Sequence, residues 1–210
     1  MPSVKALLVN HGFADASVDI KIQKRKKGIA RDIVKEAETG YNAVVLRRRG
    51  FSALESVFIG SVANKLLSKI SFIPLIITGK FSSVKKILLA IDGSESSHRM
   101  VDFVGDYLGE LDYEIVLLNV IRGLKAMSLV YPDIRVSNDH FEPLRSEIRN
   151  VFIELKIKLV DFGFDPEKIT EKIVTSDFSR AGAIVKEASS DGYSAIAVGR
   201  RGISKVEEFL

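Results

Sequence analysis

Residues 85–97 read KKILLAIDGSESS, in which a short apolar run (KILLAI, 86–91) ends in a stretch rich in Asp, Gly and Ser. Further near-continuous apolar runs of strand length occur at 115–120 (IVLLNV), 194–198 (SAIAV), 42–46 (NAVVL) and 75–78 (LIIT). Such runs are typical of parallel strands that helices cover on both faces. Two alternating runs, VDIKI at 18–22 and ITEKIV at 169–174, instead predict edge strands.

Helical patterns lie between these predicted strands. Apolar residues at helical spacing form one stripe at Val101, Val104, Leu108 and Leu111, and a longer one at Leu144, Ile148, Val151, Leu155, Leu159 and Phe162. Ser94 is placed to cap the first of these helices. Because strands alternate with helices, the sequence predicts an α/β fold with right-handed crossovers and an open, doubly wound parallel sheet.

The composition excludes several classes of protein. With 46% hydrophobic residues the chain can bury a core, so general disorder is excluded. The absence of cysteine excludes disulfides, thiolate zinc sites and cysteine nucleophiles, and the three histidines have no metal-ligand spacing. No apolar run approaches the roughly 20 residues of a membrane helix. We therefore expect a soluble, cytoplasmic protein without metal or membrane contact.

The chain contains an internal repeat. At an offset of 151, residues 3–37 align with 154–188 and thirteen positions are identical. At an offset of 152, residues 40–58 align with 192–210 and eight more are identical. We therefore expect two incomplete copies of one domain: residues 1–80 are the C-terminal half of the first, and residues 81–210 are a second copy without its last helix and strand.

Charge divides along the same boundary. Residues 1–80 carry 14 Lys and Arg against 6 Asp and Glu, whereas residues 81–210 carry 17 against 21. The basic run at 24–27, together with the arginines at 47–49, could form a patch for RNA or for an anionic surface. No nucleic-acid motif supports that interpretation, and we do not expect nucleic acid as a partner.

Two loops are candidates for ligand binding, since ligands of open α/β sheets bind beyond the carboxyl ends of the strands. One loop is 92–97, after the strand at 86–91. The other is 199–202 (GRRG), after the strand at 194–198. Glycines between a strand and a helix let backbone N–H groups approach a phosphate, and arginines add positive charge. For an isolated GxxG, a tight strand-to-helix turn is the explanation that we favour.

The first copy extends the glycine pattern. There Arg47, Arg48, Arg49 and Gly50 are followed by nine residues and then by Gly60 and Ser61. We expect a helix that begins near Leu54 and contains Gly60 and Ser61.

This Gly-x2-Gly-x9-Gly-Ser/Thr spacing after a buried strand resembles the nucleotide-binding pattern of the ATP-binding universal stress proteins. The segments KKILLAIDGSESS, EIVLLNVI and GYSAIAVGRRG resemble strand one with its loop, strand two, and strand four with its phosphate loop. The resemblance covers most of the chain, and tandem copies occur in that family. It implies an adenine nucleotide α-hydrolase-like sheet of order 3-2-1-4-5 with four helices. It also implies ATP, with ADP and AMP left open, across the ends of strands one and four.

The resemblance also implies roles for particular residues. Asp92 would face the adenine or ribose, Val120 would meet the base through its backbone, and Gly199 and Gly202 would bind the phosphates. Gly60 and Ser61 match the last two positions of the motif, although they lie in the first copy. The remaining binding candidates are Ser94, Arg200 and Gly50. We expect no dedicated catalytic residue and no metal site.

Departures from the pattern leave alternatives open. Arg47 replaces the leading glycine of the first copy, and the Gly-Ser of the second copy would fall beyond Leu210. Residues 59–78 either stay with the first copy, which we favour because a short local connection costs less entropy, or complete the second. The alternative functions are a nucleotide-free dimerisation module and a slow ATP-hydrolysing or adenylyl-transferring enzyme. A homo-oligomer or intramolecular pairing of the domains is expected, because incomplete copies expose sheet edges.

Overall fold

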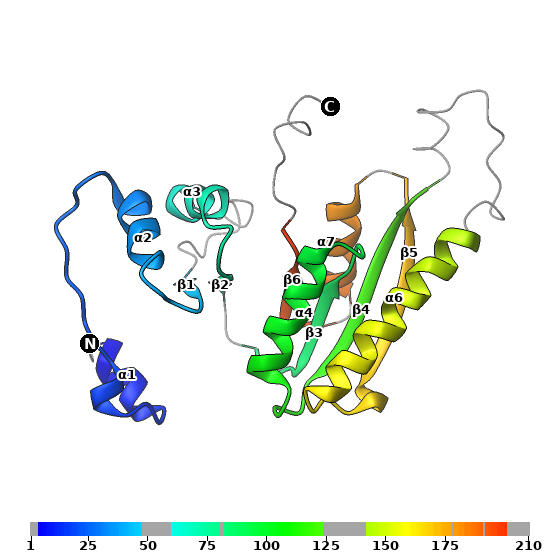
Figure 1. Cartoon of the computed structure of the whole chain (residues 1–210), viewed down its shortest axis with the longest axis horizontal. Coiled ribbons are helices and arrows are strands. Elements are labelled where there is room, and N and C mark those ends of the chain that lie inside the picture. Colours follow the sequence, from blue (N-terminus) through cyan, green and yellow to red (C-terminus); the bar gives the residue numbers. More distant parts are fainter. Residues whose placement is uncertain are drawn as a thin grey trace. The chain divides into compact units, whose positions relative to one another are not determined.

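A computed structural model (Figure 1) describes residues 4–47, 60–79, 82–123, 142–177, 179–190 and 192–200. The chain divides into two compact units, which we call unit 1 (Met1–Thr78) and unit 2 (Gly79–Leu210).

Unit 2 contains a parallel sheet of four strands: β3 (Lys86–Ala90), β4 (Glu114–Arg122), β5 (Ile169–Ser176) and β6 (Ala195–Val198). Their order in the sheet is β5-β4-β3-β6. Numbered along the unit, this is 3-2-1-4, which agrees with the first four positions of the expected order. The fifth strand stays a prediction. The α/β fold with a parallel sheet is confirmed, and β5 is an edge strand as its alternating sequence predicts.

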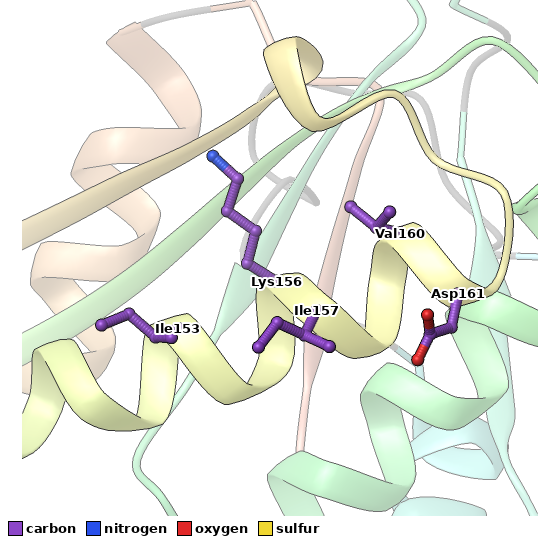
Figure 2. A pocket seen from close by; sticks show the side chains of 5 residues that line it. All are labelled: Ile153, Lys156, Ile157, Val160 and Asp161. Carbon is purple, nitrogen blue, oxygen red and sulfur yellow. The ribbon is translucent and has the colours of Figure 1, made fainter.

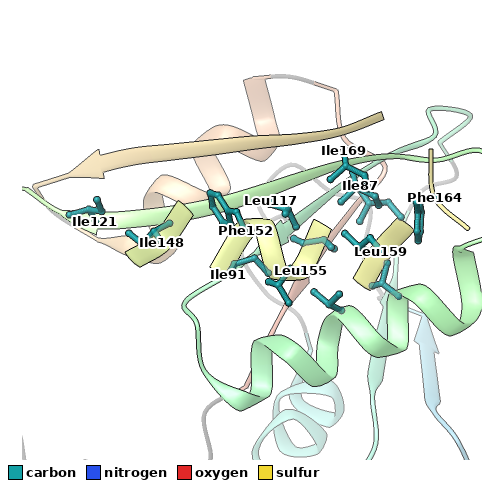
Figure 3. Close-up of a cluster of buried hydrophobic side chains, with 14 residues drawn as sticks. Ile87, Ile91, Leu117, Ile121, Ile148, Phe152, Leu155, Leu159, Phe164 and Ile169 are labelled. Carbon is teal, nitrogen blue, oxygen red and sulfur yellow. The ribbon is translucent and has the colours of Figure 1, made fainter. Parts of the chain in front are cut away.

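Helices cover both faces of this sheet, with α4 (Glu95–Leu108) and α6 (Glu142–Asp161) on one face and α7 (Arg180–Ser190) on the other (Figure 1). A short 3-10 helix, η4 (Pro166–Lys168), precedes β5. The larger core cluster combines alternate residues of β3 and β4, such as Ile87, Leu89 and Leu117, with Leu155 and Leu159 of α6 (Figure 3). The intervening residues of the same strands form a second cluster with α7.

The helix predictions hold apart from their ends. Ser94 caps α4 as expected, because its side chain accepts a hydrogen bond from the N–H of Ser97. Leu111, the last residue of the first predicted stripe, lies beyond the end of α4 and is exposed. Leu144, the first residue of the second stripe, is exposed in the first turn of α6.

Unit 1 consists of α1 (Val4–Asn10), the 3-10 helix η1 (Asp15–Ser17), α2 (Ile29–Ala37), β1 (Val44–Arg47), α3 (Ser61–Lys69) and β2 (Leu75–Thr78). Strands β1 and β2 are parallel, with Val44 opposite Leu75. Leu66 and Ile70 form a small core with Ala30 of α2, and Val44 packs against it. The pairing of β2 with β1 is the local connection that we favoured.

Two expectations about unit 1 are wrong. Residues 18–22, predicted as an edge strand, form no strand, because the described part of unit 1 offers them no neighbouring strand with which to pair. The second wrong expectation is that Gly60 lies inside a helix. Gly60 is the residue before α3 and has a φ of +97°, a conformation incompatible with a helix interior, and Ser61 is the first residue of α3. The predicted start near Leu54 lies outside the described residues.

Across the described residues, no helix combines the length and the apolar character that crossing a membrane requires.

Candidate functional site

The loop after β3 is held by hydrogen bonds to one carboxylate. Asp92 Oδ1 accepts from the backbone N–H of Ser94 at 3.0 Å and from its hydroxyl at 2.6 Å. Gly93, between them, has a φ of +74°, which a residue with a side chain rarely adopts. The loop therefore keeps the exposed Asp92 beside the N-terminus of α4.

The hydroxyl of Ser94 is committed to this loop. Its proton is donated to Asp92. It therefore accepts from the Ser96 hydroxyl, which lies 2.8 Å away, and it also accepts from the N–H of Ser97 at 3.4 Å. Ser97, which is buried, donates its own hydroxyl to the carbonyl of Ser94 at 2.8 Å. Ser94 thus fixes the start of α4, and direct contact of Ser94 with a ligand stays a prediction.

The loop after β6 lies against the first turn of α4. A Cβ added to Gly199 would stand 2.7 Å from the carbonyl carbon of Ser96 and 2.7 Å from the nitrogen of Ser97. Both contacts are to backbone atoms, so only glycine allows this approach. The loop at 92–97 and the start of the second loop, at Gly199, are therefore brought together at the carboxyl edge of the sheet.

Val120 lies on the part of β4 that extends past β3. The pairing of β3 with β4 ends at Ala90 and Leu118, and the carbonyl of Leu118 accepts from the N–H of Ile91 at 2.8 Å. Since backbone groups alternate in direction along a strand, the N–H and C=O of Val120 point to the same side as those of Leu118. The side chain of Val120 is buried, so Val120 would contact a ligand through its backbone.

Asn119 is a residue of this edge that the sequence analysis missed. Its buried side-chain amide donates a 2.8 Å hydrogen bond to the carbonyl of Ile91, directly before the Asp92 loop. The available signal was a single polar residue inside the apolar run IVLLNV. Buried amides need partners, so such a residue predicts a specific hydrogen bond even where its partner is unknown.

The remaining candidates divide by location. Arg200, half-buried, follows Gly199 directly. Gly60 and Ser61 lie in unit 1, at the start of α3. Gly50 and Gly202 fall outside the described residues. In the described part of the chain, no group of three or more His, Asp or Glu side chains is placed to hold a metal ion.

The same three-residue cluster of Lys, Glu and Tyr occurs in both units. In unit 2, Lys172 and the hydroxyl of Tyr193 donate to Oε1 of Glu187 at 2.6 and 3.1 Å. In unit 1, the cluster consists of Lys21, Glu36 and Tyr41.

Hydrogen bonds in unit 1 change the pKa values of this cluster. The bond from Lys21, followed by that from Tyr41, lowers the pKa of Glu36 to about 2. The bond to Glu36, in turn, raises the pKa of Lys21.

A groove with a volume of about 300 Å³ lies elsewhere, on the outer surface of α6 (Figure 2). It is lined by Ile153, Lys156, Ile157, Val160 and Asp161. All five come from one helix, and none belongs to the loops at the carboxyl edge. The groove is therefore separate from the candidate site.

The fold and the edge define a doubly wound α/β domain in which the residues that follow two neighbouring parallel strands meet at the carboxyl edge of the sheet. The sequence model of the universal stress protein family matches residues 83–210, and the chain belongs to this family. Universal stress protein YxiE of Bacillus subtilis (strain 168) is 31% identical over 130 residues, which are 60% of this chain and 84% of that protein.

Solved structures of universal stress proteins align with parts of this chain. A universal stress protein from Archaeoglobus fulgidus DSM 4304 aligns with 86% of this chain and 57% of its own, with 18% identity and a TM-score of 0.51. A universal stress protein crystallised in complex with cAMP aligns with 61% of this chain and 86% of its own, with 18% identity and a TM-score of 0.46.

Proposed function

We propose that unit 2 binds an adenine nucleotide, ATP above all, at the carboxyl edge of its sheet. The observation that carries this proposal is the contact of Gly199 with the backbone of Ser96 and Ser97. This contact joins the loops after β3 and β6 into one edge, at the point where the strand order reverses. Open α/β sheets bind ligands at this reversal point.

Asp92 is the group that we assign to the ribose or the adenine. A carboxylate only accepts hydrogen bonds, and ribose hydroxyls and the adenine amino group are donors. Its Oδ1 is occupied by Ser94, so the loop fixes the direction of the carboxylate. A phosphate beside Asp92 would be repelled, which favours the nucleoside end of the ligand at this position.

The backbone of Val120 completes the nucleoside end in this proposal. Its N–H and C=O point to the β3 side of the sheet, past the last residue of β3 that pairs with β4. One donor and one acceptor together match the edge of a purine base. Asn119 supports both partners, because it lies next to Val120 and bonds the carbonyl that precedes Asp92.

The phosphates are assigned to the loop that begins at Gly199. Gly199, Arg200 and Gly202 would supply backbone N–H groups and one guanidinium, which suits a polyphosphate. Family membership supports this assignment, as does the match of Gly199 and Gly202 to the first two glycines of the nucleotide-binding pattern.

We further propose that the two units are incomplete tandem copies of this domain. Three observations support the proposal. The 3-10 helices η1 and η4 lie 151 residues apart, the starts of α2 and α7 also lie 151 apart, and the Lys, Glu and Tyr cluster recurs at matching positions. The likeness in fold to the Archaeoglobus fulgidus protein, moreover, extends over 86% of this chain.

Two finer properties belong to the same proposal. We place the protein in the cytoplasm, since a cysteine-free chain lacks the disulfides common in small secreted domains. We also propose a homo-oligomer formed through the outer edge of β2, the equivalent of the last edge strand through which the family usually pairs.

Titration of the whole chain with ATP, with the heat of binding measured by calorimetry, tests the nucleotide site. Asp92→Asn keeps an oxygen acceptor for Ser94 but removes the charge, and we expect it to weaken ATP binding about tenfold, or about 1.4 kcal/mol. Glu95→Gln is the matched control: Glu95 is exposed in the first turn of α4 and pairs with Arg99, and its loss leaves ATP binding unchanged. Absence of binding at millimolar ATP, or equal effects of both variants, contradicts the proposal.

A further inference from the structure

We propose that residues 20–31 of unit 1, which we call the basic segment, attach the protein to the surface of a membrane with negatively charged lipid headgroups. The proposal concerns unit 1 alone and is independent of the nucleotide site of unit 2. It departs from the expectation of no membrane contact, which rested on the lack of a membrane-spanning segment. Attachment at the surface of a bilayer needs no such segment.

The basic segment carries a charge that the fold does not require. It contains six Lys or Arg and no Asp or Glu, and four of the cations are consecutive at 24–27. At the offset of 151, the equivalent residues of unit 2 are 171–182, which contain two Lys or Arg and two Asp or Glu. Both stretches lead into a helix, since α2 and α7 begin 151 residues apart. Unit 2 therefore makes the same turn into a helix without the positive charge.

Hydrogen bonds hold the basic segment along α2. The side chains of Lys21 and Gln23 donate to the carboxylate of Glu36 at 2.6 and 3.2 Å. The backbone N–H groups of residues 26 and 27 donate to the carboxylate of Asp32 at 2.9 and 3.1 Å. Because Asp32 and Glu36 are four residues apart, they lie on the same face of α2. The chain before α2 therefore runs antiparallel to this helix and brings its consecutive cations to the start of the helix.

The consecutive cations are available to a ligand. In unit 2 several lysines pair with carboxylates, as Lys158 does with Asp102. Among the described residues, by contrast, no carboxylate forms an ion pair with the run at 24–27 or with Arg31. Asp32, which holds the run, directs both carboxylate oxygens at backbone N–H groups. Clusters of about four or more such cations are typical of binding to anionic lipid headgroups.

Exposed isoleucines stand on both sides of the cations. Ile20 and Ile29 are 63% and 56% exposed, and neither belongs to the small core of unit 1. Their equivalents in unit 2 are Glu171 and Arg180, which are both exposed, so the fold places these positions at the surface. An isoleucine at a surface position is unfavourable in water, whereas the boundary between headgroups and acyl chains can bury it.

These apolar side chains favour a lipid surface over a nucleic acid. Proteins that bind single strands of nucleic acid stack the bases on aromatic side chains, and the basic segment contains no aromatic residue. A bilayer surface offers phosphates to the cations and an apolar boundary to the isoleucines. The cytoplasmic leaflet of a membrane is the negatively charged one, which agrees with the location that we propose for the protein.

Sedimentation of the full chain with lipid vesicles tests the proposal. We expect the chain to bind vesicles of phosphatidylcholine mixed with phosphatidylglycerol, to ignore vesicles of pure phosphatidylcholine, and to lose affinity as the salt concentration rises. Arg25→Gln removes one cation of the run and should weaken binding to the mixed vesicles about fivefold. Lys65→Gln is the matched control, because Lys65 is an exposed cation of α3 outside the basic segment, and its loss should leave the affinity unchanged.

Fluorescence distinguishes a lipid surface from other polyanions. The chain contains no Trp, so Ile29→Trp introduces a single reporter. Its emission should shift to shorter wavelength when the mixed vesicles are added, because the indole ring enters the apolar boundary. Phe72→Trp is the control: Phe72 is a similarly exposed residue of unit 1, between α3 and β2, and its emission should not shift.

Three outcomes overturn the proposal. The first is that the chain does not bind the mixed vesicles. The second is that Arg25→Gln weakens binding no more than Lys65→Gln does, or that the emission of Ile29→Trp does not shift. The third is that single-stranded RNA or inorganic polyphosphate binds the chain more tightly than the vesicles do, which makes another polyanion the partner. ATP titration of the same variants keeps the two proposals apart, because all of these changes lie in unit 1 and leave nucleotide binding to unit 2 unaltered.

Discussion

Lys172 on β5 donates a 2.6 Å hydrogen bond to the carboxylate of Glu187 on α7. Glu187 is only 8% exposed, and it also accepts from the hydroxyl of Tyr193, which lies just before β6. One carboxylate therefore links an edge strand, the crossover helix and the entry to the next strand.

We expect Lys172→Met to destabilise unit 2 by about 2 kcal/mol, because it leaves a buried carboxylate without its cation. Tyr193→Phe removes a single neutral donor and should cost about 1 kcal/mol. Hydrogen exchange of the β5 amides under conditions of global opening measures both effects.

The control for this prediction lies in unit 1. Lys21→Met removes the equivalent cation from Glu36, whose side chain is more exposed, so water replaces the lost partner and the effect is smaller. An equal loss in both units would show that burial of Glu187 does not set the strength of the interaction.

The cluster of unit 1 predicts a defined dependence on acid. Hydrogen bonds from Lys21, Tyr41 and Gln23 lower the pKa of Glu36 from 4.5 to about 2. A carboxyl group with a lowered folded-state pKa adds stability above its unfolded-state pKa and loses it as the pH falls through the folded-state value. We therefore expect unit 1 to lose stability between about pH 4.5 and pH 2, and Glu36→Gln to flatten the profile.

Hydrogen exchange of the α2 amides across this pH range measures the effect. Asp32, whose pKa the N–H groups of Lys26 and Lys27 lower, leaves a residual dependence in the variant. Glu38→Gln, a change of an exposed carboxylate just after the same helix, is the matched control and should keep the slope of the unmodified chain. A Glu36→Gln profile as steep as the control profile contradicts the prediction.

Asn119 gives a prediction that connects stability to the candidate site. Asn119→Leu leaves the carbonyl of Ile91 without its side-chain donor, and we expect a loss of about 1–3 kcal/mol in unfolding free energy. Since that carbonyl precedes Asp92, the affinity for ATP should fall as well, by about tenfold.

Urea denaturation and ATP titration of the same samples separate the two effects. Thr170→Val is the control, because Thr170 makes a long 3.4 Å bond to the carbonyl of Ile115 at the amino end of the sheet. It should cost less stability and leave ATP binding unchanged. An Asn119→Leu chain that binds ATP normally would exclude a positioning role for Asn119.

Sequence patterns predicted most of the strands well, because short, near-continuous apolar runs are typical of parallel strands. The run at 75–78 agrees with β2 residue for residue, and the run at 86–91 exceeds β3 by one. Segment 18–22 failed because alternation describes a half-buried surface, whereas a strand also needs a neighbour to which it can bond. Its equivalent 169–174 has the same pattern and pairs with β4.

The candidate site was predictable only in part. The loops at 92–97 and 199–202 could be chosen from glycine, serine and aspartate after apolar runs. The bond of Asn119 to Ile91 could not, because it joins residues 28 positions apart and no local pattern encodes its partner. The same holds for the closeness of Gly199 to Ser96, which depends on β6 lying beside β3.

That closeness yields a further test. In Gly199→Ala the new methyl group would stand 2.7 Å from two backbone atoms of α4, and a backbone cannot move aside as a flexible side chain can. We expect unit 2 to lose about 2 kcal/mol, the usual cost of overpacking. Gly182→Ala provides the comparison. Gly182 lies inside α7, and its added methyl group would stand 3.6 Å from the side chain of Ser179, which is an ordinary contact distance. There alanine favours the helix and should add about 0.5–1 kcal/mol. Urea denaturation of both variants gives opposite signs if the contact between Gly199 and α4 is as close as the structure has it, and a neutral Gly199→Ala would mean that the two loops stand further apart.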